Sequence, residues 1–274
     1  MKKTLMALCV VMASGSAMAW TTGDFNGTVD FGGSITPEQY GQQWEWESGT
    51  GLNNFVNTVK DLTDDAKKLA ITADKDYPIL KGRTTAAFST GEGNIPSIAF
   101  SDYEGQSVSL HQDTSSAEGT GYFDLPIKDE SNQKIGTLHV NATAAGMVVG
   151  KYDGGPARTS VTAESTGDMF FGGLFNKVIP NALHVSEFIG KYTVSSGALM
   201  NQVTSADSTM KKYWTGNYTW ANKLNAQPSA LNFPLAAVYV MLIQQGQTLA
   251  ATFDSSITSA TKWSAPLNIS VTYN

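Results

Sequence analysis

Cysteine is almost absent from this sequence, because the 274-residue chain contains a single one, Cys9. Cys9 lies in an N-terminal segment where two lysines precede an apolar run and residues 17–19 form an A-x-A cleavage pattern. These features are typical of a secretory signal peptide. Cleavage after Ala19 would leave residues 20–274 without cysteine. We therefore expect an exported protein that folds without a disulfide bond or a cysteine metal site.

Basic charge and long apolar runs are also scarce. The chain carries 18 Lys and Arg against 24 Asp and Glu, with a net charge of −6 and a pI near 5.0. It lacks the basic surface typical of a nucleic-acid-binding protein. The longest apolar run after the signal, Leu235–Ile243, has nine residues, which is too short to cross a bilayer. The sequence predicts neither a nucleic-acid partner nor membrane insertion.

The sequence contains none of the common catalytic motifs. The three histidines, His111, His139 and His184, are far apart and form no HExxH motif. No P-loop and no G-x-S-x-G element are present. We therefore predict no catalytic residue, no metal site, no cofactor and no enzymatic activity.

Short runs in which apolar and polar residues alternate recur along the chain. Leu138 and Val140 alternate with polar neighbours, and Trp44 and Trp46 share one face of a run and are expected in the core. This period of two predicts half-buried strands. Strands are expected at Lys68–Thr72, Pro96–Phe100, Ser107–Leu110, Tyr122–Ile127, Thr137–Ala142 and Gln247–Phe253. Many short strands between turns predict an all-β antiparallel sandwich.

The alternation weakens between residues 151 and 235. Leu199, Met200 and Val203 have helical spacing, and Ser195 or Ser196 is a suitable N-cap before them. We interpret residues 151–235 as an insertion in the sandwich that carries one or two short helices.

Four aromatic residues within the insertion lie among polar residues. An exposed aromatic ring beside Asn, Thr or Lys suits the apolar faces and hydroxyl groups of a sugar. The alternative is that the two tryptophans anchor the insertion to the sandwich. The candidate glycan-binding residues are Tyr213, Trp214, Tyr218 and Trp220.

Both ends of the mature chain alternate strictly. At the N-terminus the odd positions are apolar or glycine: Phe25, Gly27, Val29, Phe31, Gly33 and Ile35. Glycine inside a strand indicates a close approach of another backbone. The C-terminal segment alternates in the same way from Trp263 to Tyr273. The pattern fits two edge strands of a self-contained sandwich, and it also fits an N-terminal strand that pairs with another copy of the protein.

Several stretches resemble one known family, the FaeG-like subunits, major or minor, of the kappa-class chaperone–usher fimbriae of enterobacteria. The resemblance covers the signal, residues 20–150 and residues 236–274, and the segment 151–235 departs from it. The matching stretches include Thr22-Gly-Asp-Phe-Asn-Gly27, Gly32-Gly-Ser-Ile-Thr36, Trp44-Glu-Trp46, Gly49-Thr-Gly-Leu-Asn53, Pro78-Ile-Leu-Lys-Gly-Arg-Thr84, Ile98-Ala-Phe-Ser-Asp-Tyr-Glu-Gly105, Gly246-Gln-Thr-Leu-Ala-Ala-Thr-Phe253 and Trp263-Ser-Ala-Pro-Leu-Asn-Ile-Ser-Val-Thr-Tyr273.

The resemblance implies an incomplete immunoglobulin-like sandwich that is completed by donor-strand complementation. A periplasmic chaperone lends a strand, and the N-terminal extension of a neighbouring subunit replaces it at the outer-membrane usher. Chaperone–pilin complementation is a standard example of β-strand addition. The implied domains are a signal peptide at 1–19, a donor strand at 20–35 and a pilin domain at 36–274.

The resemblance also implies where the sites lie. The donor strand uses its odd-numbered face, and a chaperone or donor strand docks along the C-terminal strand, at Leu267, Ile269, Val271, Tyr273 and the terminal carboxylate of Asn274. The implied function is a structural fimbrial subunit on the bacterial surface, reached through the periplasm, with host glycan as a further partner. The alternatives are a minor or tip subunit, and a self-contained secreted carbohydrate-binding or hydrolytic protein.

Overall fold

A computed structural model describes residues 43–53, 55–89, 94–152, 155–210, 216–217, 222–224 and 234–274. All of these residues belong to one compact unit, Gln39–Asn274. The predicted signal peptide and donor strand lie outside the described residues.

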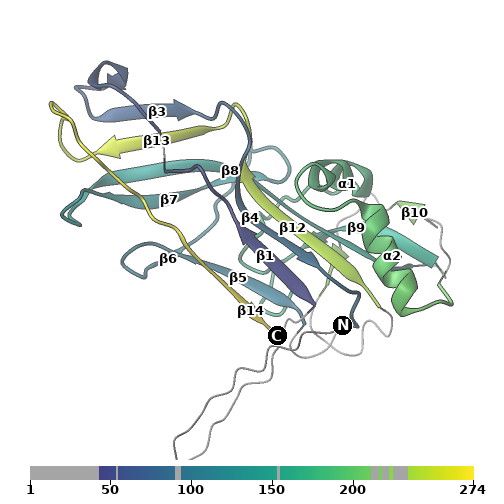
Figure 1. Cartoon of the computed structure of the whole chain (residues 1–274). Coiled ribbons are helices and arrows are strands. Elements are labelled where there is room, and N and C mark those ends of the chain that lie inside the picture. The colour runs from purple at the N-terminus through teal and green to yellow at the C-terminus, as the bar shows by residue number, and fades with distance from the viewer. Residues whose placement is uncertain are drawn as a thin grey trace, which may run out of the picture. The chain divides into compact units, whose positions relative to one another are not determined.

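The described residues form two β-sheets (Figure 1). Along its main path the larger sheet has the order β1 (Trp44–Ser48), β4 (Tyr77–Thr84), β12 (Ala236–Ile243), β8 (Lys134–Tyr152), β13 (Thr248–Phe253), β3 (Lys68–Thr72) and β2 (Leu62–Thr63). Off this path lie β7 (Thr120–Lys128) and β9 (Gly155–Thr162), which pair with β8, and the short β10 (Gly216–Asn217) and β11 (Asn222–Lys223), which pair with β9. The smaller sheet has the order β14 (Asn268–Tyr273), β5 (Pro96–Ser101) and β6 (Ser107–Val108).

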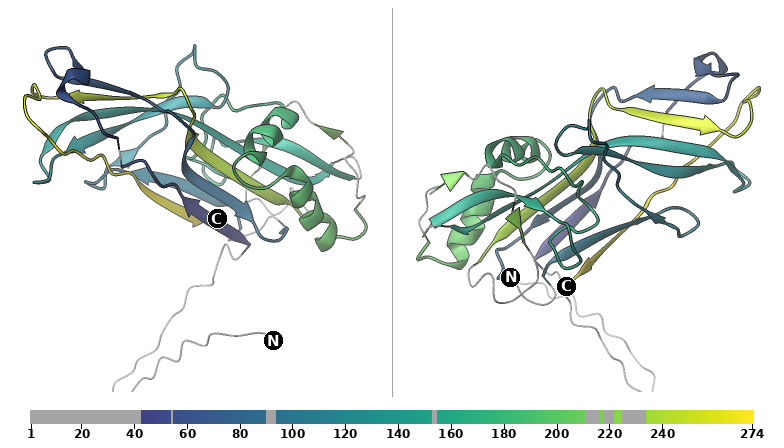
Figure 2. Two further views of the ribbon diagram at one scale, coloured as in Figure 1. Left: turned by 45° about the horizontal axis from the view of Figure 1, so that its top comes forward. Right: turned by 180° about the vertical axis from the view of Figure 1, so that it is seen from behind.

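Strand β8 connects the two halves of the larger sheet. Its first half pairs with β7 and β13, and its second half pairs with β12 and β9. Figure 2 shows the strand running from one half of the unit into the other. Gly146 lies in the second half, where an added Cβ would lie 2.7 Å from the ring of Phe170. A side chain at this position would displace a core aromatic ring.

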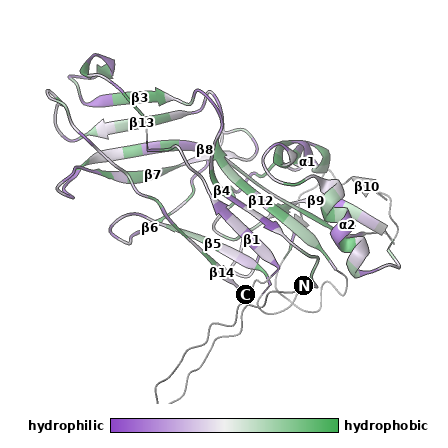
Figure 3. Ribbon diagram, viewed as in Figure 1, coloured by the Kyte–Doolittle hydropathy of each residue, from purple (hydrophilic) through white to green (hydrophobic). Residues whose placement is uncertain are grey.

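Strand β12 is buried on both faces, and Figure 3 shows it as hydrophobic along its length. Its odd-numbered residues, such as Tyr239 and Met241, face the core between the two sheets. Its even-numbered residues, such as Val238 and Val240, face a second core under the helices. Two-sided burial explains why the run from 235 to 243 is continuously apolar instead of alternating.

Two helices cover this second core. Helix α1 (Ala182–Gly190) begins after Asn181, whose side chain accepts hydrogen bonds from the backbone of Leu183 and His184. Helix α2 (Ser196–Ala206) begins after Ser195, whose side chain accepts a hydrogen bond from the backbone of Ala198. The prediction of short helices in the 151–235 segment, with a serine N-cap, is therefore confirmed.

The expected strands are confirmed, with differences at their ends. Strand β6 is shorter than expected, and β8 is much longer than the predicted Thr137–Ala142. The C-terminal strand begins at Asn268, not at Trp263. Pro266 explains this late start, because proline has no N–H to donate to a β-ladder.

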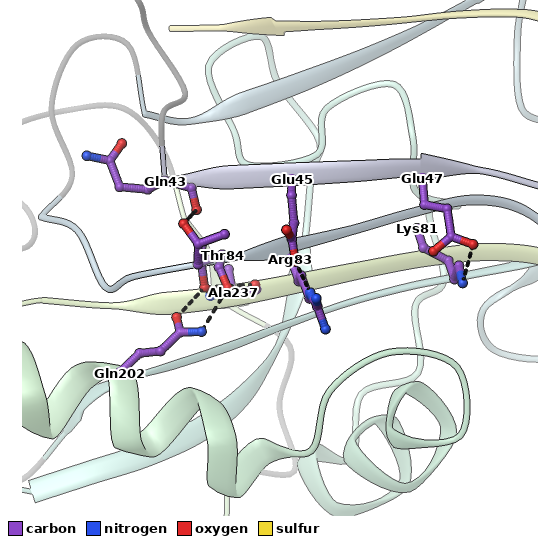
Figure 4. A network of polar contacts seen from close by, with 9 residues as sticks. Gln43, Glu45, Glu47, Lys81, Arg83, Thr84, Gln202 and Ala237 are labelled. Carbon is purple, nitrogen blue, oxygen red and sulfur yellow. Dashed lines mark hydrogen bonds and ion pairs between the residues drawn. The ribbon is translucent and has the colours of Figure 1, made fainter. Parts of the chain in front are cut away.

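Polar contacts fix the edge strand β1 to its neighbour (Figure 4). On the outer face, Glu45 pairs with Arg83 and Glu47 pairs with Lys81 at 2.9 Å. Both are cross-strand neighbours in the β1–β4 register, where opposite charges stabilise a sheet. The next residue of β4, Thr84, donates its hydroxyl to the side-chain oxygen of Gln202 on α2 at 2.7 Å. This edge is thus tied both across the strands and to helix α2.

The second core allows a matched test. Leu199 on α2 is fully buried, whereas Leu183 on α1 is 41% exposed. We expect Leu199→Ala to lower the free energy of unfolding by about 2–5 kcal/mol because it leaves a cavity, and Leu183→Ala to lower it by about 0.5 kcal/mol or less. Urea unfolding followed by tryptophan fluorescence measures both. Equal effects would contradict the described packing.

Candidate functional site

Two of the edge strands, β1 and β14, flank one part of the described unit. Strand β1 pairs with β4, and β14 pairs with β5, but neither has a described partner on its other side. An unpaired edge presents a row of backbone N–H and C=O groups that can bind an additional strand.

The inward-facing side chains of β14 are only half-buried. Ile269, Val271 and Tyr273 alternate with exposed polar residues. Their register partners on β5 behave differently, because Phe100 and Ile98 are buried, with exposures of 4% and 3%. The apolar side chains of β14 are therefore less buried than those of its neighbour β5.

A groove of about 880 Å³ lies beside these half-buried residues. Protein interiors contain few voids larger than a water molecule, so a space of this size is not a packing defect. One wall consists of residues 48–53 and Phe55, and the other of residues 261–267 and Ile269. The floor consists of core side chains from both halves of the sheet: Ile79, Phe123, Leu125, Leu138, Val140, Ile243 and Leu249.

The first wall depends on a glycine directly after β1. An added Cβ on Gly49 would lie 1.5 Å from the carbonyl oxygen of Pro78. The backbone N–H of Gly49 donates to the carbonyl of Ile79 at 3.0 Å. Only glycine permits this close contact, which directs the chain away from β4 and along the groove.

The second wall is the extended segment between β13 and β14. Its Ser264 exchanges two backbone hydrogen bonds with Lys128 at the end of β7, at 2.8 and 2.9 Å. The segment then crosses to the smaller sheet, where β14 begins. It is the yellow segment that runs past β7 toward the C-terminus in Figure 1. The half-buried Trp263 and Leu267 contribute its apolar surface.

A hydrogen bond joins strands β1 and β14. Trp46 of β1 donates from Nε1 to the hydroxyl oxygen of Tyr273 at 2.8 Å. The Trp46 ring stacks on Trp44 with 5.5 Å between ring centroids. It also lies over Gly82, where an added Cβ would lie 2.3 Å from the ring. Burial raises the pKa of Tyr273, and the hydrogen bond from Trp46 opposes that rise.

The C-terminal residue is tied to the smaller sheet. Asn274 donates its backbone N–H to the carbonyl of Ile95 at 2.9 Å, and its side-chain amide donates to the hydroxyl of Ser97 at 2.7 Å. The end of β14 is thus fixed although Asn274 itself is exposed.

The structure places the sequence-predicted residues as follows. Leu267 and Ile269 line the groove, and Val271 and Tyr273 continue the same face toward Trp46. Trp44 is in the core as expected, whereas Trp46 is half-buried. The donor-strand residues Phe25, Gly27, Val29, Phe31, Gly33 and Ile35 lie outside the described residues. The aromatic candidates Tyr213, Trp214, Tyr218 and Trp220 do so as well.

The sequence alone did not predict the first wall of the groove or the hydrogen bond between β1 and β14. The pairing of Trp46 with Tyr273 joins residues 227 positions apart in the chain, and no local pattern reports such a contact. Gly49 and Gly51 were visible signals of a change in chain direction after β1.

Metal sites and membrane-spanning helices were also sought among the described residues. No group of three or more His, Cys, Asp or Glu residues there could hold a metal ion. None of the described helices is long and apolar enough to cross a membrane.

Comparisons with known proteins agree with this geometry. The family model described as "Fimbrial, major and minor subunit" matches residues 1–274. The K88 fimbrial proteins AD and AB of Escherichia coli are each 41% identical to this chain, over 286 and 290 residues that cover 100% of both sequences. The F41 fimbrial protein of Escherichia coli is 27% identical over 292 residues, with the same coverage.

The fold, the groove and these matches define the class: the protein is a structural subunit of a fimbria on the bacterial surface, and not an enzyme. It belongs to the K88 family of fimbrial subunits. The resemblance inferred from the sequence is confirmed, and so is the expectation of an all-β, immunoglobulin-like fold with a helical insertion.

The Trp46–Tyr273 hydrogen bond can be tested with a matched pair. Tyr273→Phe leaves the indole N–H unpaired, so we expect it to lower the free energy of unfolding by about 1 kcal/mol. Tyr103 has a buried hydroxyl with no hydrogen-bond partner among the described residues, so Tyr103→Phe is expected to leave stability unchanged or to raise it. Denaturant unfolding of both variants provides the comparison, and a neutral Tyr273→Phe would argue against the bond.

Proposed function

We propose that this chain polymerises by donor-strand exchange, with residues 20–35 of one copy filling the groove of the next. The observation that carries the proposal is the groove between the segment after β1 and the segment that leads into β14. Its floor is apolar, and the neighbouring strands β1 and β14 each have an edge without a described partner, which are the properties that an added β-strand requires. Residues 24–35 supply a strand with apolar side chains on one face.

The burial of the strand supplies a large driving force. Four side chains, Phe25, Val29, Phe31 and Ile35, each gain roughly 1.5–3 kcal/mol on full burial. The sum is about 6–12 kcal/mol, an upper bound before the cost of association is subtracted. Backbone hydrogen bonds to the free edge of β14 add to it. A joint of this kind dissociates slowly, which suits a fibre that must persist outside the cell.

A chaperone and an usher follow from the same groove. An open groove exposes sheet edges and apolar side chains and is therefore an aggregation hazard. A periplasmic chaperone that lends a strand along Leu267, Ile269, Val271 and Tyr273 removes the hazard, with the carboxylate of Asn274 as a charged anchor. Replacement of that strand by a second copy at an outer-membrane usher then yields the fibre. Membership in a family of major and minor subunits supports this assembly role over a self-contained secreted protein.

The donor strand can be tested with two variants of equal charge. Val29→Asp places a carboxylate on the apolar face and should abolish fibres, because burying that charge costs several kcal/mol. Thr28→Asp places the same charge on the opposite face and should leave fibre formation intact. Electron microscopy and sedimentation of the assembled material give the readout. Normal fibres from Val29→Asp would contradict donor-strand exchange through this face.

We also propose that the segment 151–235 contributes to adhesion by binding a host glycan. The support is the sequence alone, which places Tyr213, Trp214, Tyr218 and Trp220 among polar residues. Aromatic rings beside amide and hydroxyl groups suit sugar recognition.

This second role is tested with a self-complemented subunit in which residues 20–35 follow Asn274 through a short linker. We expect saturable binding to at least one glycan on a host glycan array, and a loss of about tenfold or more in affinity on Trp214→Ala or Trp220→Ala, in line with an anchor worth at least 1.4 kcal/mol. Phe188→Ala on α1 is the control for loss of an aromatic residue elsewhere in the insertion. A folded, non-binding subunit would place adhesion in another fimbrial protein.

A further inference from the structure

Two valines are exposed on the loop that leads from the first groove wall to β2. Val56 is 92% exposed and Val59 is 47% exposed. Among the described residues, the only other large hydrophobic side chain with such exposure is Leu183, at 41%, on α1. Covering these two side chains would gain free energy in proportion to the apolar area removed from water.

The loop is held in a fixed shape. Thr58 donates its backbone N–H and its hydroxyl to the carboxylate of Asp61, at 2.6 and 2.9 Å. These bonds close a short 3-10 turn, Val59–Asp61, and they hold the pKa of Asp61 below its usual value. The ring of Phe55 packs edge-on against Tyr77, with 5.8 Å between centroids. The valines are therefore presented by a rigid element.

The loop stands at one particular end of the groove. Leu52 and Phe55 line the groove directly before Val56 in the chain, opposite Thr261 and Trp263 of the other wall. The Trp46–Tyr273 hydrogen bond lies outside the groove lining, between β1 and β14. The apolar lining thus continues out of the groove past Phe55 onto the exposed valines.

We infer that the Val56–Val59 loop contacts the folded domain of the neighbouring copy whose N-terminal strand fills the groove. The inference rests on the proposed donor-strand exchange. The chain that links the inserted strand to its own body must leave the groove at one of its ends. We take the inserted strand to run antiparallel to β14, the commoner pairing in β-sheets, which places its residue 35 near Trp263.

Chain length identifies the occupant. Residues 36–42 separate the donor strand from the first described residue of the body, and seven residues span at most about 25 Å. The body of the donor copy is thus confined to the groove end beside Val56. A second copy of this chain is present at that position at every joint of the fibre. Its contact with the valines resists bending between successive subunits.

Thiol labelling tests the contact directly, because residues 20–274 contain no cysteine. Val56→Cys, Val59→Cys and, as a matched control, Leu183→Cys each introduce a single thiol on an exposed hydrophobic position. Maleimide labelling rates are compared between assembled fibres and the full mature chain kept monomeric by an excess of synthetic peptide of residues 20–35.

We expect labelling at positions 56 and 59 to slow by about tenfold or more in fibres, because an interface core excludes solvent, while position 183 labels equally in both states. Equal rates at position 56 in fibres and monomers would overturn the inference and leave donor-strand exchange standing. Fibres that form despite the excess peptide would instead overturn the donor-strand exchange on which the inference rests.

Discussion

The groove between the segment after β1 and the segment that leads into β14 is the constraint on which the rest of this structure depends. Its volume is about 880 Å³, and the half-buried Ile269 of β14 is among the apolar side chains that line it. A folded chain gains free energy by covering such a surface, and an uncovered one aggregates. The floor, the glycine that starts one wall and the extended segment that forms the other border this space.

The two halves of the larger sheet differ in what covers them. The half built on β9, β12 and the end of β8 is closed, since α1 and α2 cover its outer face and bury a second core. The floor of the groove comes from β7, β13 and the first half of β8, with one residue each from β4 and β12. Because β8 runs through both halves, the closed core supports the open one. This arrangement explains how a chain with no cysteine in its mature part can keep a large apolar groove without collapsing around it.

The sequence predicted those elements whose burial is one-sided. Alternation located β3, β5, β7 and β13, and the serine before residue 196 located α2. The alternation is lost where both faces are buried, because β12 is continuously apolar and residues 144–149 of β8 contain only apolar residues and glycine. For the site, alternation found the β14 face of the groove. The opposite wall and the Trp46–Tyr273 bond could not be predicted, since they depend on contacts between residues far apart in the chain. The late start of β14 was visible in Pro266.

Hydrogen exchange along β14 is the most direct measurement of the central claim that the groove receives a strand. The free edge of β14 carries backbone N–H groups that point away from β5 and have no described partner. On addition of the peptide of residues 20–35, we predict strong protection of these N–H groups, while those bonded to β5 change little. Unchanged exchange along the free edge of β14 with bound peptide would contradict the account, because the strand would then lie elsewhere.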